Sequence, residues 1–306
     1  MQYCELVRKP YPPLPIVMAT PLSQSLTPTL KPSLSVRLMQ IGGGITLFFI
    51  GIAIVAPLLQ AIGIFQDPTD FLNNPPQSPP SLAHWFGTTR LGFDVFSRVM
   101  FAAQSALQVV FISMTLSITI GVFLGMVSGY LGGNLDRVLV FVMDAIYTLP
   151  GLLLAVTLSF VLGRGVLNAS VSLAIAYIPQ YYRVVRNQTV SVKTEMYIEA
   201  AQSMGAGTVH ILRKYLLLNV IQSVPVILTL NAADAVLTLG GLGFLGLALP
   251  PGVPEWGNDL REALDILATG AGWWTSVFPG LAMTVLVVGL SLLGEGLNEL
   301  TEKKGR

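Results

Sequence analysis

The 306-residue chain has few of the charged residues that soluble proteins need. Only 11% of its residues are charged, whereas 53% are apolar, and the mean hydropathy is +0.68. A soluble globule of this length needs more polar side chains to cover its surface, so the sequence predicts an integral membrane protein. The net charge of +1 lacks the excess of Lys and Arg that phosphate contacts require, and we expect no nucleic-acid partner.

The chain also has little of what redox and metal sites need, with one cysteine, Cys4, and two histidines, His84 and His210. A single cysteine cannot form a disulfide within the chain, and the two histidines lack the spacing of metal ligands. No Gly-x4-Gly-Lys-Ser/Thr loop occurs, so ATP cannot bind here through a P-loop. Metalloprotease and serine-hydrolase motifs are missing as well. We therefore expect no catalytic residue, metal or cofactor in this chain.

Six apolar runs are long enough to cross a bilayer, which takes roughly 20 residues. They cover residues 39–61, 104–130, 136–162, 165–185, 220–248 and 276–298, and they predict an all-α membrane protein with six transmembrane helices. With the amino terminus inside, 13 of the 17 Lys and Arg residues lie on the inner side. Only Arg90, Arg98, Arg164 and Arg261 then lie outside. The positive-inside rule therefore predicts cytoplasmic termini and a cytoplasmic loop at 186–219.

The composition of the remaining segments suggests how the chain is divided. Residues 1–37 are rich in Pro, Ser and Thr, and we expect a flexible cytoplasmic tail there. Residues 38–103 are expected to hold the first transmembrane helix and an outer loop in which Asp94 caps a short interfacial helix. Residues 104–300 would form a core of five transmembrane helices, and residues 301–306 a cytoplasmic tail.

The long cytoplasmic loop has the pattern of a helical hairpin. Between Thr194 and Met204, polar residues fall on one helical face and apolar residues on another. Gly205 stands where a helix commonly ends in a left-handed turn, and Thr208 is expected to cap a second helix beginning at Val209.

Small and adaptable side chains make this hairpin suitable for a partner. Ala200 and Ala201 would let another surface approach the backbone closely, and Met204 can adapt its shape to a groove. An ordinary amphipathic connector packed on the ends of the spans is the alternative.

The segment Tyr197–Ala201 followed by Gly205 resembles the coupling loop of ATP-binding-cassette importer permeases. Further segments between residues 84 and 300 resemble the peptide/nickel branch of this family, and in particular the second permease of dipeptide and oligopeptide importers. These segments are Gly92–Arg98, Ser128–Arg137, Asp144 with Pro150, Asn219–Val220, Gly243–Leu247, Pro250–Pro251 and Trp256–Gly257. The chain departs from the family at Leu218, where proline is usual, and at Leu239, where glutamate is common.

The resemblance implies a type I importer fold whose coupling hairpin, within residues 190–219, binds cytoplasmic ATPases. It assigns ATPase coupling to Tyr197, Glu199, Ala200, Ala201, Met204 and Gly205. The implied partners are a homologous permease, two ATPase subunits that carry ATP and Mg²⁺, and an extracytoplasmic solute-binding protein. The chain would lie in the bacterial inner membrane and import short peptides, with a nickel chelate or another small solute as the alternative.

Two carboxylates, Asp144 and Asp234, fall within predicted spans, where a charge is costly unless it faces water or a partner. Together with Asn231 they are candidate residues of the translocation pathway. Asp144 has the alternative role of satisfying backbone groups freed by Pro150. A proton-coupled secondary transporter that uses these carboxylates as a relay is a rival function, but it leaves the segment at 199–205 unexplained. A membrane scaffold that recruits a soluble partner is a third.

Overall fold

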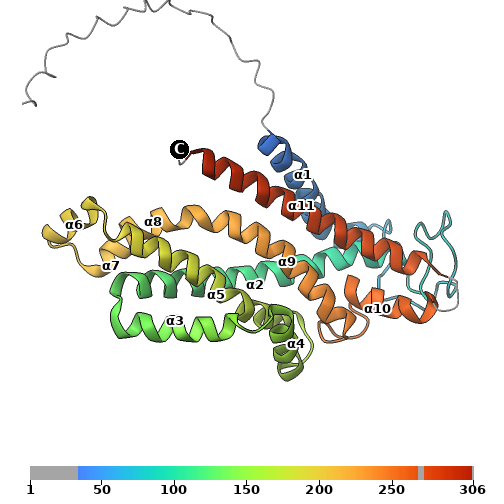
Figure 1. Cartoon of the computed structure of the whole chain (residues 1–306). Coiled ribbons are helices and arrows are strands. Elements are labelled where there is room, and N and C mark those ends of the chain that lie inside the picture. The colour runs from blue at the N-terminus through green and yellow to red at the C-terminus, as the bar shows by residue number, and fades with distance from the viewer. Residues whose placement is uncertain (1–33, 268–271, 305–306) are drawn as a thin grey trace, which may run out of the picture. The chain divides into compact units, whose positions relative to one another are not determined.

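The computed structural model describes residues 34–267 and 272–304, which belong to one compact unit. Its described residues are helices joined by loops, with one isolated β-bridge between Thr88 and Asp94 (Figure 1). In chain order the helices are α1 (Leu34–Ala61), α2 (Val95–Leu131), α3 (Gly133–Tyr147), α4 (Gly151–Leu162), α5 (Val166–Val192), α6 (Met196–Ser203), α7 (Thr208–Ile211), a π-helical turn η1 (Leu212–Leu216), α8 (Leu217–Val220), a 3-10 turn η2 (Ile221–Ser223), α9 (Val224–Phe244), α10 (Trp256–Leu267) and α11 (Trp274–Lys304).

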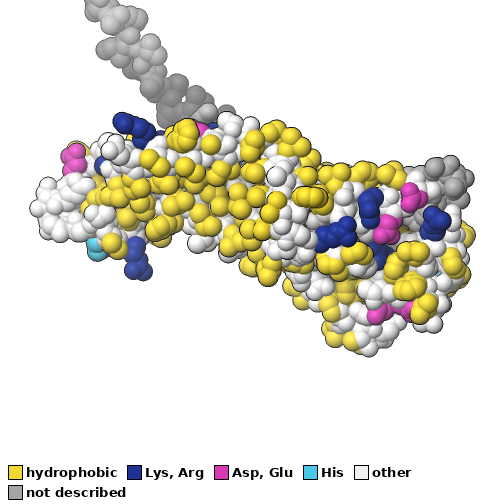
Figure 2. Space-filling view, turned by 90° about the horizontal axis from the view of Figure 1, so that it is seen from below, with side chains coloured by type: hydrophobic (Ala, Val, Ile, Leu, Met, Phe, Trp, Pro, Cys, Tyr) yellow, Lys and Arg dark blue, Asp and Glu magenta, His cyan; other side chains and the backbone are white. Residues whose placement is uncertain are grey.

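Length and composition identify four or five candidate membrane spans among the described residues. Four are α1, α2, the helical segment Thr208–Phe244 and α11. The fifth is the pair α3 and α4, which is bent by 89° at Thr148–Pro150. Figure 2 shows a broad hydrophobic band between two ends at which charged side chains gather, as expected for helices that lie in a bilayer. The expected span at 165–185 lies in α5. This helix is long enough to cross a bilayer, but it is more polar than the candidate spans.

Several predicted boundaries were wrong. The first helix begins at Leu34, so residues 34–37 belong to it, while residues 1–33 of the expected tail lie outside the described residues. The last helix continues to Lys304, which makes most of the expected carboxy-terminal tail helical; residues 305–306 are not described. In both places the helix extends beyond the apolar run, and Arg, Lys and Glu, which occur in these extensions, are good helix formers.

The expected interfacial helix is instead the start of α2. Asp94 does cap a helix, because its Oδ2 accepts a hydrogen bond from the Ser97 backbone N–H at 2.8 Å. That helix runs without interruption to Leu131, since neither glycine nor proline occurs between residues 95 and 120. Asp94 therefore fixes the first turn of a long span.

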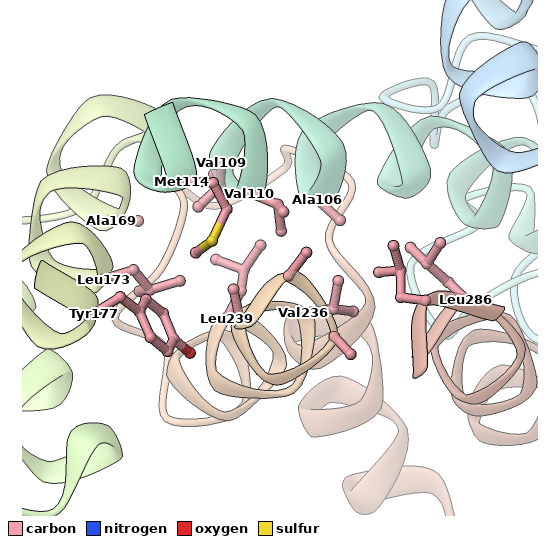
Figure 3. Close-up of a cluster of buried hydrophobic side chains, with 14 of the residues drawn as sticks. Ala106, Val109, Val110, Met114, Ala169, Leu173, Tyr177, Val236, Leu239 and Leu286 are labelled. Carbon is pink, nitrogen blue, oxygen red and sulfur yellow. The ribbon is translucent and has the colours of Figure 1, made fainter. Parts of the chain in front are cut away.

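The centre of the unit is the contact between α2 and α5, which glycines allow to be close. A Cβ at Gly121 would lie 2.6 Å from the Tyr181 Cβ, and one at Gly125 would lie 2.7 Å from the Tyr182 carbonyl oxygen. Figure 3 shows the neighbouring core, where Leu239 of α9 packs among side chains of α2 and α5. Leu239 is 1% exposed, so the leucine that replaces the family's common glutamate fits an apolar site.

A buried ion pair joins α10 to α2 at the end opposite the α6–α7 hairpin. The Arg98 guanidinium donates two hydrogen bonds to Asp259 Oδ1, at 3.0 and 2.5 Å, and two more to the Pro68 and Gly252 carbonyl oxygens at 3.3 Å. Close by, the Trp256 indole N–H donates to the Val99 carbonyl oxygen at 3.0 Å. These contacts tie α10 and the loop before α2 into one rigid end.

Candidate functional site

The hairpin predicted in the long loop is present as α6 and α7. Helix α5 ends at Val192, Glu195 is the N-cap of α6, and Gly205 follows α6 with φ of +82°, the left-handed turn that the sequence predicts. The second helix begins one residue earlier than expected, because Gly207 and not Thr208 precedes its first turn. The prediction that Thr208 caps this helix with its side chain was therefore wrong.

A small apolar core holds the hairpin in place. Ile198 from α6, Ile211 from α7 and Leu216 from η1 are buried together, each at most 1% exposed. Tyr130, at the end of α2, packs against them. Because α7 also runs through η1 and α8 into α9, the hairpin is continuous with a membrane-spanning segment. The absence of proline at Leu218 is consistent with this continuity.

Polar contacts fix the hairpin to α2 and to its own second arm. Lys193 donates to the Tyr130 carbonyl oxygen at 2.6 Å, and Gln202 Nε2 donates to the Tyr130 hydroxyl at 3.2 Å. Asn219 Nδ2 donates to the Tyr197 hydroxyl at 3.3 Å and to the Tyr215 carbonyl oxygen at 2.7 Å. These contacts connect the hairpin to the end of α2 and to α8.

The outer face of the hairpin brings together most of the residues that the sequence singled out. Glu199, Ala200 and Gly205 are exposed, Met204 is 80% exposed, and Tyr197 is 42% exposed. We call this set, Tyr197, Glu199, Ala200, Met204 and Gly205, the hairpin face. The Glu199 side chain forms no hydrogen bond or ion pair with another described residue. The hairpin face is therefore free to meet another protein.

Ala201 behaves differently from its neighbour Ala200. It is 2% exposed and lies beneath the hairpin face, where its carbonyl oxygen accepts the Ala206 N–H at 3.0 Å. Its small side chain therefore serves the internal packing of the hairpin.

Sequence reasoning missed the residues that anchor the hairpin. Tyr130, Lys193 and Asn219 contact it from outside the predicted coupling set. Tyr130 and Asn219 both lie in segments that resemble the permease family, and this resemblance could have identified them as candidate residues. Lys193 had none beyond its charge.

The three candidate pathway residues lie in different surroundings. Asp144 is exposed on α3, and its Oδ1 accepts from Arg183 Nη2 at 2.9 Å, so its side chain pairs with another helix and not with backbone near Pro150. Asp234 is exposed on α9, and its Oδ2 accepts from the Tyr177 hydroxyl at 2.7 Å. Asn231 is 6% exposed, with its Nδ2 unpaired among the described residues.

Residues 121–306 match the family described as binding-protein-dependent transport system inner membrane component. This match covers more than half of the chain, and the chain belongs to that family. It is a permease component of an ATP-binding-cassette importer of the peptide/nickel branch, a multi-pass inner-membrane protein and not an enzyme. No cofactor is expected in such a component, and residues 34–267 and 272–304 contain no cluster of three metal-binding side chains.

Two of the relatives are described as permeases of glutathione transport systems. The chain is 40% identical to the glutathione transport system permease protein GsiD of Shigella flexneri serotype 5b (strain 8401) over 235 residues, which cover 77% of this chain and 76% of that protein. It is 37% identical, with the same coverage, to the protein of the same description from Escherichia coli O157:H7.

Proposed function

We propose that this chain forms half of the translocation pathway of an ATP-driven importer for short peptides, paired with a homologous permease as a heterodimer. Two cytoplasmic ATPase subunits hold the coupling hairpins of the two permeases, and an extracytoplasmic binding protein delivers the solute. The resemblance to glutathione permeases supports a peptide cargo, since glutathione is a tripeptide. The chain then crosses the membrane six times, with the more polar helix α5 as the sixth span. Both termini lie in the cytoplasm.

The observation that carries this proposal is the hairpin, exposed on one side and anchored on the other. Its core of Ile198, Ile211 and Leu216 transmits a push on the hairpin face to the helices behind it. Closure of the ATPase pair on ATP would move the hairpin as a rigid lever and open the cavity outward, and hydrolysis would return it. Asp144 and Asp234 then line the pathway, while Asn231 supports it from within α9.

Replacing Ala200 with tryptophan tests the coupling role. Ala200 is exposed and Ala201 is buried, so Ala200→Trp changes the docking surface without filling the hairpin core. We expect ATP-driven uptake to fall at least tenfold while the protein still inserts into the membrane. The matched control is Ala61→Trp, an exposed alanine at the other end of the helices, which should keep normal uptake. Normal uptake by Ala200→Trp would count against coupling through this face.

The cargo is tested separately by transport competition. Cells that depend on this system are given labelled glutathione, and unlabelled dipeptides, longer peptides or a nickel chelate are added in excess. Competition by peptides alone supports the proposed cargo. Competition by the nickel chelate alone would assign the system to the metal-chelate members of the same branch.

A further inference from the structure

Helix α5 is too polar to be an ordinary lipid-facing span. Among the described helices of 18 residues or more, α5 alone is not apolar enough for a membrane span. Three of its polar residues, Gln180, Arg183 and Asn187, recur at intervals of three and four and therefore lie along one side of the helix. Arg183 and Asn187 are exposed and Gln180 is partly exposed. We call these three residues the polar stripe.

Two acidic side chains from neighbouring helices accompany the polar stripe. Asp144 pairs with Arg183 although the two side chains are 54% and 45% exposed. Asp234 is held through one oxygen by Tyr177 of α5, whose ring is buried, while its Oδ1 accepts no hydrogen bond from the described residues. Each carboxylate therefore has one oxygen held by a hydrogen bond and is still exposed.

The depth of these groups excludes lipid as their surroundings. Asp144 lies within the bent pair α3 and α4, and Asp234 lies within the helical segment Thr208–Phe244. Both segments are candidate membrane spans, so both carboxylates lie in parts of the chain that are expected to cross the hydrocarbon core. An exposed charge at that depth costs a few kcal/mol in lipid and much less when it faces water.

We propose that the polar stripe, with Asp144 and Asp234, is the wall of a water-filled passage that recognises both charged ends of a zwitterionic peptide. The free oxygen of Asp234 takes the peptide's ammonium group, and Arg183 takes its carboxylate. Tyr177 is a positioning residue, because it holds the Asp234 carboxylate in place without reaching the exposed face. This inference rests on the proposed peptide import, and the homologous permease closes the passage on its open side.

Water access along α5 is tested with single cysteines in the assembled transporter. Cys4→Ser removes the one native thiol, and Gln180→Cys or Asn187→Cys then places a thiol on the polar stripe. The control is Phe123→Cys on α2, which is 61% exposed and lies at a similar depth, because Gly121 and Gly125 contact residues 178–185 of α5. We expect a membrane-impermeant, water-soluble thiol reagent to label both stripe positions in opened vesicles and to leave position 123 unlabelled. Equal labelling at all three positions, or labelling at none, would overturn the proposal.

Recognition of the ammonium group is tested by transport kinetics. Asp234→Asn keeps the shape of the side chain and removes its charge, so the maximal uptake rate of a zwitterionic peptide should fall about tenfold at equal levels of assembled transporter. Asp234→Glu should restore part of that rate, and Tyr177→Phe should lower the same rate by a smaller factor without changing the amount assembled. Uptake by Asp234→Asn at the wild-type rate would overturn the assignment. Failure of the wild-type transporter to use ATP would instead contradict the proposed function.

Discussion

At the scale of single residues, Glu255 is a buried acid outside the spans. Its side chain caps α10, with the Gly257 N–H donating to Oε1 at 2.8 Å and the Asn258 N–H donating to Oε2 at 2.7 Å. It is 2% exposed, and this burial raises the pKa of Glu255 to about 7 against an ordinary value of 4.5, although the two N–H groups act in the opposite direction. The end of the molecule that carries α10 therefore contains a carboxyl group with a pKa of about 7.

This raised pKa predicts that the end that carries α10 is more stable in mild acid. The folded state holds the Glu255 proton more tightly than the unfolded state, so the stabilising contribution is complete below pH 4.5 and is lost as pH rises towards 7. The full effect is about 3 kcal/mol. We expect the thermal unfolding midpoint of the purified protein to fall between pH 5 and 8, and Glu255→Gln to reduce this fall. An identical pH profile for the variant would contradict the assignment.

At the scale of elements, close pairs of helices depend on glycines at defined places. Gly125 of α2 faces the Tyr182 carbonyl oxygen and the Val185 side chain of α5, and a Cβ there would lie within 3.0 Å of both. Since backbone cannot yield as a flexible side chain does, a larger residue must push the two helices apart.

Gly125→Val is therefore expected to disrupt the contact between α2 and α5 and to cost a few kcal/mol of stability. The matched control is Gly51→Val in α1, since a Cβ at Gly51 meets nothing within 4 Å. The amount of folded protein extracted in mild detergent, and its thermal unfolding midpoint, measure the effect. Equal behaviour of the two variants would show that this contact does not determine stability.

The hairpin depends on a glycine for a different reason. A Cβ at Gly205 would meet no atom within 4 Å, so only the φ of +82° restricts this position. A β-branched residue is strongly disfavoured in that conformation, whereas asparagine is tolerated more readily.

We therefore expect Gly205→Val to reduce ATP-driven uptake at least tenfold, because the turn after α6 changes, and Gly205→Asn to retain most of it. Both variants should insert into the membrane at normal levels. The comparison is made by uptake per assembled transporter. Similar losses for valine and asparagine would mean that the glycine is needed for space at the partner interface and not for its backbone conformation.

At the scale of the whole molecule, much of the arrangement could be predicted because apolar runs and helical periodicity are local properties of the sequence. The 199–205 segment and its left-handed glycine belong to this class. The bend between α3 and α4 and the true start of α2 were missed, since tertiary packing and capping decide where a helix ends. Periodicity placed the apolar residues between Thr194 and Met204 on one helical face, but it could not tell that Ala201 packs inward while Met204 projects outward.

The central claim is that a separate ATPase drives this permease through the hairpin face, and reconstitution into sealed vesicles tests it most directly. Vesicles contain this chain, its homologous permease and both ATPase subunits, with the binding protein and labelled peptide on the side away from the ATPases. The account predicts peptide accumulation only when ATP, the binding protein and both permeases are present, and none with Ala200→Trp. Accumulation driven by a proton gradient in vesicles without the ATPases would contradict it.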